Sequence, residues 1–175
     1  LNSIDLSSNM LNGSIPKEIF SIQIGKSLKL GKNHFSGELP QEIGLLDTVV
    51  TVDVCDNKLS GNIPSAISNC KSLETLNMSK NSFSGLIPTS LGQLNALETL
   101  DLSENDLKGE LPCGGVFRNL SRVHLQGNPE ISPRLSCQNT ENNSHHHNFQ
   151  NIVIIVIAAF LLVFVIIISF VYVMR

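Results

Sequence analysis

The sequence predicts an α/β-type repeat solenoid built from short parallel strands, followed by a polar linker and one transmembrane helix. Three observations support this prediction. A pattern of Asn, Gly and Pro recurs five times at intervals of 24 residues. Apolar residues precede each Asn at the alternating spacing of a strand with one buried face. The last part of the chain contains a long apolar stretch that has no charged side chain.

The repeat keeps the same internal spacing in all five copies. Gly follows the Asn by four residues and Pro follows it by seven, and apolar residues stand five and three positions before it. A sixth, weaker copy ends at Asn128. One copy alone cannot bury its apolar face, but stacked copies can, so the period indicates a solenoid. The recurring residues, interpreted as a structural Asn ladder, are Asn9, Asn33, Asn57, Asn81 and Asn105.

Each residue type that recurs in the repeat has a physical role. The Asn amide can bond backbone groups of its own turn and of the neighbouring copy. The Gly permits a tight turn, and the Pro cannot continue a sheet, so the chain turns outward. A loosely helical return, such as 65–68, then leads to the next copy. In the second copy Gly25 replaces the first apolar residue of the ladder, so we expect a locally loosened strand there.

The segment 152–174 predicts a transmembrane helix. It contains no Asp, Glu, Lys or Arg, and only Ser169 and Tyr172 are mildly polar. As a helix it would be about 34 Å long, which exceeds the ~30 Å core of a bilayer. Arg175 follows and is a weak signal for the cytoplasmic side. Because the chain begins without Met and ends at this Arg, we expect a fragment in which residue 175 starts a cytoplasmic segment.

Composition argues against two classes of protein. The chain has 175 residues with 12 basic and 15 acidic side chains, so the basic excess typical of a nucleic-acid-binding protein is missing. No Ser/His/Asp set, phosphate loop or metal-ligand spacing occurs, so we expect neither an enzyme nor a cofactor in this chain. The run 145–147 is three His in a polar linker without a second ligand cluster, and we interpret it as solvated linker.

The repeats resemble the plant type of leucine-rich repeat, whose pattern is LxxLxLxxNxLxGxIPxxLGxL. Residues 73–94 read LETLNMSKNSFSGLIPTSLGQL, and residues 97–120 read LETLDLSENDLKGELPCGGVFRNL. The resemblance covers about residues 1–128, and the Gly with the (I/L)-Pro pair distinguishes the plant type from other leucine-rich repeats. Residues 114–130, GGVFRNLSRVHLQGNPE, resemble the last repeat and cap of plant receptor-like kinases of the pattern-recognition and disease-resistance kind.

This resemblance implies a domain organisation. Leucine-rich repeats occupy 1–128, a cap remnant and polar juxtamembrane linker occupy 129–151, and the transmembrane helix occupies 152–174. The resemblance also implies a single-pass protein of the plasma membrane with the N-terminal side extracellular.

The resemblance implies a function as well. The chain would be the ligand- or co-receptor-binding ectodomain portion and membrane anchor of a receptor-like Ser/Thr kinase in defence or developmental signalling. The implied partners are a peptide or protein ligand, a co-receptor leucine-rich-repeat kinase and the lipid bilayer, with no nucleic acid. The chain itself contains no kinase motif. The alternative is therefore a kinase-less receptor-like protein or a truncated decoy receptor.

In a leucine-rich solenoid the strands line the concave side, and the outward positions lie four and two residues before each Asn. These side chains do not serve the core and are free to contact a partner, although a merely solvated face is the alternative. The set is small, polar and mixed in charge, which favours recognition of a peptide or protein. The expected partner-facing residues, including two from the last turns, are Asp5, Lys29, Asp53, Asn77, Ser79, Asp101, Ser103, Glu104, Arg122, His124 and Gln126.

The four cysteines allow at most two disulfides. We expect Cys55 and Cys70 to be free thiols, the second of them buried. The cap of the family usually carries a Cys pair, but Ser132 stands at the first position here, and Cys137 matches the second. A bond between Cys113 and Cys137 would replace the missing one, with two unpaired thiols as the alternative.

Four Asn-x-Ser sequons are plausible N-glycosylation sites, given the resemblance. Their number is close to what the composition predicts by chance, so they are no independent sign of secretion. One of them would place a glycan on the concave face, where it would block a ligand. The four sequons begin at Asn12, Asn77, Asn119 and Asn142.

Overall fold

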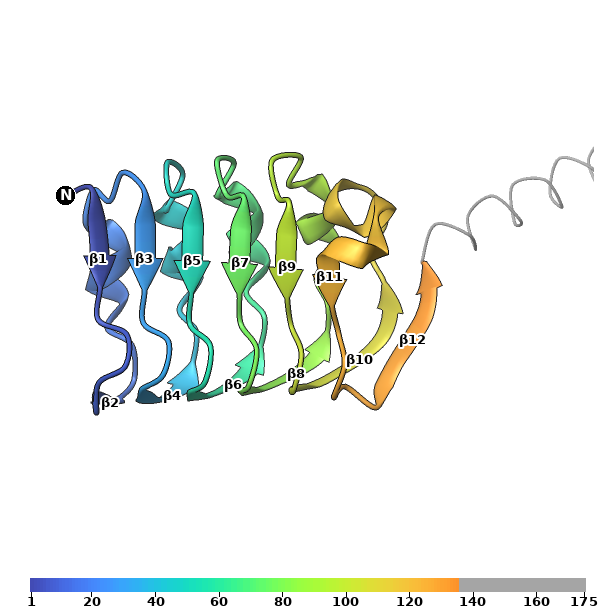
Figure 1. The fold of residues 1–175 in the computed structure, drawn as a ribbon, viewed down its shortest axis with the longest axis horizontal. Coiled ribbons are helices and arrows are strands. Elements are labelled where there is room, and N and C mark those ends of the chain that lie inside the picture. The colour runs from blue at the N-terminus through green and yellow to red at the C-terminus, as the bar shows by residue number, and fades with distance from the viewer. Residues whose placement is uncertain (136–175) are drawn as a thin grey trace, which may run out of the picture. The chain divides into compact units, whose positions relative to one another are not determined.

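Each copy of the repeat contributes one short strand to a first parallel sheet. In the computed structural model, which describes residues 1–135, this sheet has the order β1-β3-β5-β7-β9-β11, and its strands stand side by side in Figure 1. The register pairs equivalent positions of neighbouring copies, such as Leu28 with Val52 and Val52 with Leu76. The predicted solenoid of short parallel strands is confirmed. The strands are β1 (Ser3–Asp5), β3 (Ser27–Lys29), β5 (Thr51–Asp53), β7 (Thr75–Asn77), β9 (Thr99–Asp101) and β11 (Val123–His124).

A second parallel sheet, which the sequence did not predict, runs along the lower edge of Figure 1 in the order β12-β10-β8-β6-β4-β2. The strands β2 to β10 follow the ladder Asn and end shortly before the Pro, whereas β12 follows Asn128 and contains Pro133. In β6 only Leu59 is buried, and Gly61 at φ 76° interrupts the alternation that would have revealed a strand. The strands are β2 (Asn12–Gly13), β4 (His34–Glu38), β6 (Lys58–Asn62), β8 (Ser82–Leu86), β10 (Asp106–Leu111) and β12 (Glu130–Leu135).

Short 3-10 helices form the return segments, as the sequence predicts. Proline stands immediately before each of the first four, because its fixed φ suits the start of a helix and its missing N–H is not needed there. The helices are η1 (Lys17–Ser21), η2 (Gln41–Leu45), η3 (Ser65–Asn69), η4 (Thr89–Gln93), η5 (Gly115–Arg118) and η6 (Leu120–Arg122).

One apolar core runs through all the copies. Strand residues such as Val52 and Leu76 have no exposed surface, and neither do Ile43, Ile67 and Leu91 of the return helices. Each copy therefore buries its apolar residues against the next copy, which is how a solenoid is stabilised.

The Asn amides connect neighbouring copies through their backbone groups. The Nδ2 of Asn81 donates to the carbonyl oxygens of Val54, Met78 and Ser79 at 3.0, 3.2 and 3.1 Å. Its Oδ1 accepts from the backbone N–H of Leu59 at 3.0 Å. One side chain thus satisfies backbone groups of its own turn and of the preceding copy.

The prediction of a locally loosened strand in the second copy is wrong, because β3 is regular. β3 keeps its register with β1 and with β5. The backbone N–H of Gly25 donates to the carbonyl of Leu1 at 2.9 Å, and that of Lys26 donates to Asn2 at 2.7 Å. A parallel ladder is made by the backbone, so it does not need a side chain at position 25. Ile24, only 2% exposed, supplies the buried apolar group instead.

Several predictions from the sequence lie outside the described residues. These are the transmembrane helix at 152–174, the polar linker with its three His, Cys137, Asn142 and Arg175. Within residues 1–135, no helix is both long and apolar enough to cross a bilayer.

Candidate partner-binding face

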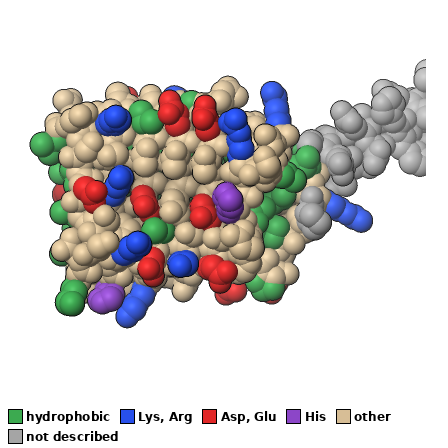
Figure 2. Space-filling view, in the orientation of Figure 1, with side chains coloured by type: hydrophobic (Ala, Val, Ile, Leu, Met, Phe, Trp, Pro, Cys, Tyr) green, Lys and Arg blue, Asp and Glu red, His purple; other side chains and the backbone are tan. Residues whose placement is uncertain are grey.

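The solvent-facing side of the first sheet, here called the strand face, carries one outward side chain per strand at the same level. Pairwise registers align these positions from β1 to β11. Figure 2, in the orientation of Figure 1, shows charged side chains of both signs interspersed among polar ones. A surface of this kind fits a polar partner rather than an apolar ligand. The aligned residues are Asp5, Lys29, Asp53, Asn77, Asp101 and His124.

The acidic and amide side chains of this row are held by groups two residues further on. The Oδ1 of Asp101 accepts from the backbone N–H and the hydroxyl of Ser103 at 2.9 and 2.6 Å. Asp5 accepts in the same way from Ser7, and this hydrogen bonding to its carboxylate lowers the pKa of Asp5. Asp5, Asp53, Asn77 and Asp101 are therefore oriented before any partner binds.

These contacts correct the expectation for two of the predicted residues. Ser79 is only 6% exposed and Ser103 only 5%, and both hydroxyls donate to the side chain two residues earlier. Their hydroxyls are therefore occupied and buried instead of free for a partner. The sequence pattern placed them on the outward side but could not show that their neighbours cover them.

Cys55 lies half-buried on the strand face beside Gly31. A Cβ added at Gly31 would lie 3.0 Å from the sulfur of Cys55, so the absence of a side chain there makes room for the thiol. Burial, followed by the hydrogen bond with Asp53, raises the pKa of Cys55 to about 12. Cys55 and Cys70 are both free thiols, as predicted, and Cys70 is buried with its sulfur donating to the carbonyl of Ile43.

The C-terminal end of the strand face is well exposed. Glu104, Arg122, His124 and Gln126 are all exposed. Arg122 also lines a polar recess of about 410 Å³ together with residues that include Glu74, Glu98, Arg118 and Asn119. Charges of both signs thus meet near the last two copies.

A second row of exposed side chains was largely missed from the sequence. The residue before each ladder Asn adopts a left-handed conformation with φ between 52° and 57°. The fixed place of this residue in the repeat could have revealed the row. Only Glu104 was predicted from the sequence to face a partner. From the second copy to the fifth the charges alternate in sign. The row consists of Ser8, Lys32, Asp56, Lys80 and Glu104.

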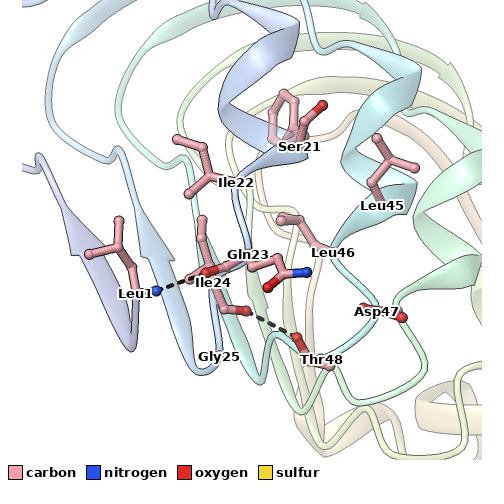
Figure 3. Close-up of a pocket in the computed structure, with 11 residues that line it drawn as sticks. Leu1, Ser21, Ile22, Gln23, Ile24, Gly25, Leu45, Leu46, Asp47 and Thr48 are labelled. Atoms are coloured by element: carbon pink, nitrogen blue, oxygen red, sulfur yellow. Dashed lines mark hydrogen bonds between the residues drawn. The ribbon is translucent and has the colours of Figure 1, made fainter.

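A notch beside the first copy forms a recess that was not predicted. It has a volume of about 910 Å³ and is lined by residues of 20–25 and 45–48 together with Leu1. Figure 3 shows the amine of Leu1 donating to the carbonyl of Gln23 at 3.0 Å and the hydroxyl of Thr48 donating to Ile24 at 3.0 Å. None of the predicted partner-facing residues lines it.

The fifth copy of the repeat contains a disulfide-bonded cysteine. Cys113, which follows β10, is disulfide-bonded. Cys137 lies outside the described residues, so its pairing with Cys113 stays a prediction.

Comparisons with known proteins agree with this architecture. Two models of the leucine-rich repeat match, one over residues 47–107 and one over residues 1–22. A chain in the solved BIR3–SERK2 complex from Arabidopsis thaliana is 36% identical with a TM-score of 0.68, and the match covers 75% of this chain and 69% of that one. The BIR2 ectodomain from Arabidopsis thaliana is 30% identical with a TM-score of 0.69, covering 74% and 68%.

A third solved structure adds a complex with two partners. The Arabidopsis receptor kinase HAESA, in complex with the peptide hormone IDA and the co-receptor SERK1, gives 33% identity and a TM-score of 0.65. That match covers 74% of this chain but 21% of the other. No curated protein sequence gives a significant match.

The two-sheet repeat and the comparisons together define a leucine-rich-repeat solenoid, and the chain belongs to the leucine-rich-repeat family. Within that family its repeats are similar to the ectodomains of plant receptor kinases.

Proposed function

We propose that the chain is the ligand- and co-receptor-binding ectodomain portion of a plant cell-surface receptor, and that 152–174 anchors it in the membrane as a single helix. One observation carries the binding function. The strand face presents an aligned row of polar side chains on a scaffold similar to ectodomains that were solved with a peptide hormone or with SERK proteins. The anchor rests on the sequence, where those 23 residues contain no charge.

The proposal assigns the co-receptor contact to the C-terminal end of the strand face. Glu104 and Arg122 are exposed there and carry opposite charges, which allows a partner to match them in a defined orientation. Two receptors held in the same membrane have a raised effective concentration, so a modest interface suffices for pairing. A Ser/Thr kinase on the cytoplasmic side would then report the pairing, and the signal would serve defence or development.

Binding of a soluble SERK1 ectodomain to the full chain on plant cells tests the proposal. The double variant Glu104→Ala with Arg122→Ala is expected to weaken the affinity by about twofold to thirtyfold, because exposed charge pairs contribute ~0.2–1 kcal/mol each. The control is Asp106→Ala with Lys108→Ala, which removes the same two charges from the exposed part of β10 in the second sheet. Equal affinity for the wild type and the first variant, at equal surface expression, would place the contact on another face.

A further inference from the structure

Two of the three sequons within residues 1–135 share a local geometry that leaves the amide nitrogen unused. The Oδ1 of Asn77 accepts from the backbone N–H and the hydroxyl of Ser79 at 3.1 and 2.7 Å. The Oδ1 of Asn119 accepts from the same groups of Ser121 at 3.2 and 2.7 Å. Within the described part of the chain, the Nδ2 of neither Asn77 nor Asn119 donates a hydrogen bond.

The ladder asparagines are the opposite case. The Nδ2 of Asn81, only four residues after Asn77, donates to three carbonyl oxygens and has no room for a substituent. The fold therefore separates the asparagines into a structural set that holds the copies together and a set whose nitrogen is available. Asn77 belongs to the available set although it lies within a strand.

The surroundings of Asn77 leave space above the sheet. β7 stands in the middle of the first sheet in Figure 1, and Asn77 aligns with Asp53 on one side and Asp101 on the other. These neighbours are short, and Ser79 and Ser103 beside them are shorter and buried. A substituent on Nδ2 of Asn77 would therefore not overlap the aligned side chains of the adjacent strands, because these are short.

We propose that Asn77 carries an N-linked glycan that covers the middle of the strand face and confines protein partners to its C-terminal end. In the attachment step, Nδ2 of Asn77 bonds to C1 of a sugar on a lipid-pyrophosphate-linked oligosaccharide. The C1–oxygen bond breaks, the lipid pyrophosphate leaves with the electron pair, and the amide gives up one proton. A branched oligosaccharide is wider than the ~4.8 Å between strands, so it covers Asp53 and Asp101 as well.

The inference rests on the proposed function in two respects. These are the cell-surface location of the chain, which exposes it to glycosylation, and the existence of a protein partner. It changes which residues can contribute to binding. Asp53 and Asp101 flank the glycan and are shielded, whereas Arg122, His124 and Gln126 belong to the next copy, which contains β11, and stay accessible.

The first part of the test is glycopeptide mass spectrometry of the full chain expressed in plant cells. The peptide with Asn77 is expected to carry a glycan, and both Asn77→Gln and Ser79→Ala should remove it. Glycans on Asn12 and Asn119 with none on Asn77 would overturn the inference and leave the proposed function intact. The absence of a glycan from all three would contradict the cell-surface location itself, and the inference with it.

The second part measures shielding directly. Carboxyl groups are labelled with a carbodiimide and a bulky amine, and the labelled peptides are quantified. Labelling of Asp53 and Asp101 is expected to rise several-fold in Asn77→Gln, and to the same extent in Ser79→Ala, while the exposed Asp47 serves as an internal reference. Asn119→Gln is the matched control and should leave Asp53 unchanged. Equal labelling of Asp53 in the wild type and in both sequon variants would overturn the inference.

Discussion

The side chains of Asn81 and Asn57 show how one residue type joins neighbouring copies of the solenoid by hydrogen bonds. The Oδ1 of Asn57 accepts from Phe35 and its Nδ2 donates to Leu30, both in the preceding copy, just as Asn81 reaches Leu59 and Val54. The carbonyl oxygens of Val54, Met78 and Ser79 each also accept a bond from Asn57, Asn105 or the N–H of Asp56. Removing the amide of Asn81 therefore takes one bond from each of these carbonyls and takes the partner of the Leu59 N–H, which costs the most.

Asn81→Ala is therefore expected to lower the free energy of unfolding by ~1–3 kcal/mol. The control is Asn95→Ala, because Asn95 is exposed and the surface substitution should change stability by no more than ~0.5 kcal/mol. Urea unfolding of both variants in mild detergent, followed by circular dichroism, measures the difference. Equal losses would mean that the ladder bonds do not contribute net stability.

The thiol of Cys55 gives a pH dependence with a definite sign. Burial first, and the hydrogen bond with Asp53 second, raise its pKa from 9.0 to about 12, so the folded protein keeps a proton that the unfolded chain loses. The contribution of Cys55 is fully present below pH 9 and is lost as the pH rises toward 12. Between pH 9 and 11, the wild type should lose more stability than Cys55→Ser. Parallel pH profiles of the two proteins would contradict the assigned cause.

At the level of elements, the packing of the return helices depends on close backbone approach. A Cβ added at Gly92 of η4 would overlap the carbonyl oxygen of Cys113, and one at Gly44 of η2 would lie 2.6 Å from the carbonyl oxygen of Ala66 in η3. These glycines therefore set the spacing between one copy and the next. Gly13 in β2 differs, because it has φ 84° and nothing within 4 Å of an added Cβ.

The variants Gly92→Ala and Gly13→Ala distinguish the two reasons why glycine is needed, close backbone approach and positive φ. The first is expected to destabilise the protein by up to ~3 kcal/mol through overpacking. The second should lose only ~1–2 kcal/mol, the penalty of a left-handed conformation for a residue with a Cβ. Thermal unfolding of the two variants measures both. A smaller loss for Gly92→Ala would show that η4 can shift away from Cys113 freely.

The elements also show which parts of the structure could be predicted from the sequence. The first sheet and the Asn ladder were predictable because their signal is a period of 24 residues carried by side-chain type. The second sheet was not, since a strand such as β6 buries few side chains and contains a glycine with positive φ. Likewise, the row of outward residues was predictable from spacing, but the burial of Ser79 and Ser103 depends on contacts with their neighbours.

On the scale of the whole described solenoid, stability is shared between adjacent copies. Backbone bonds join each copy to the next, as when the N–H of Val54 donates to Asn77 at 2.9 Å and that of Met78 donates to Asp101 at 2.8 Å. Energy in such an array is approximately a sum of terms for single copies and their interfaces. A defect in one copy should consequently weaken its neighbours first.

Leu76→Ala tests this expectation, because Leu76 of β7 is fully buried in the middle of the array. The cavity should destabilise the fourth copy by ~2–5 kcal/mol. Native-state hydrogen exchange is then expected to show the largest loss of protection at the N–H groups of Val54 and Met78. The smallest loss is expected at Leu6, which directly follows β1, three strands away from β7. Leu86→Ala is the control in the same copy, because Leu86 is 63% exposed and should change protection little. A uniform loss across all copies would instead show that residues 1–135 open as one cooperative unit.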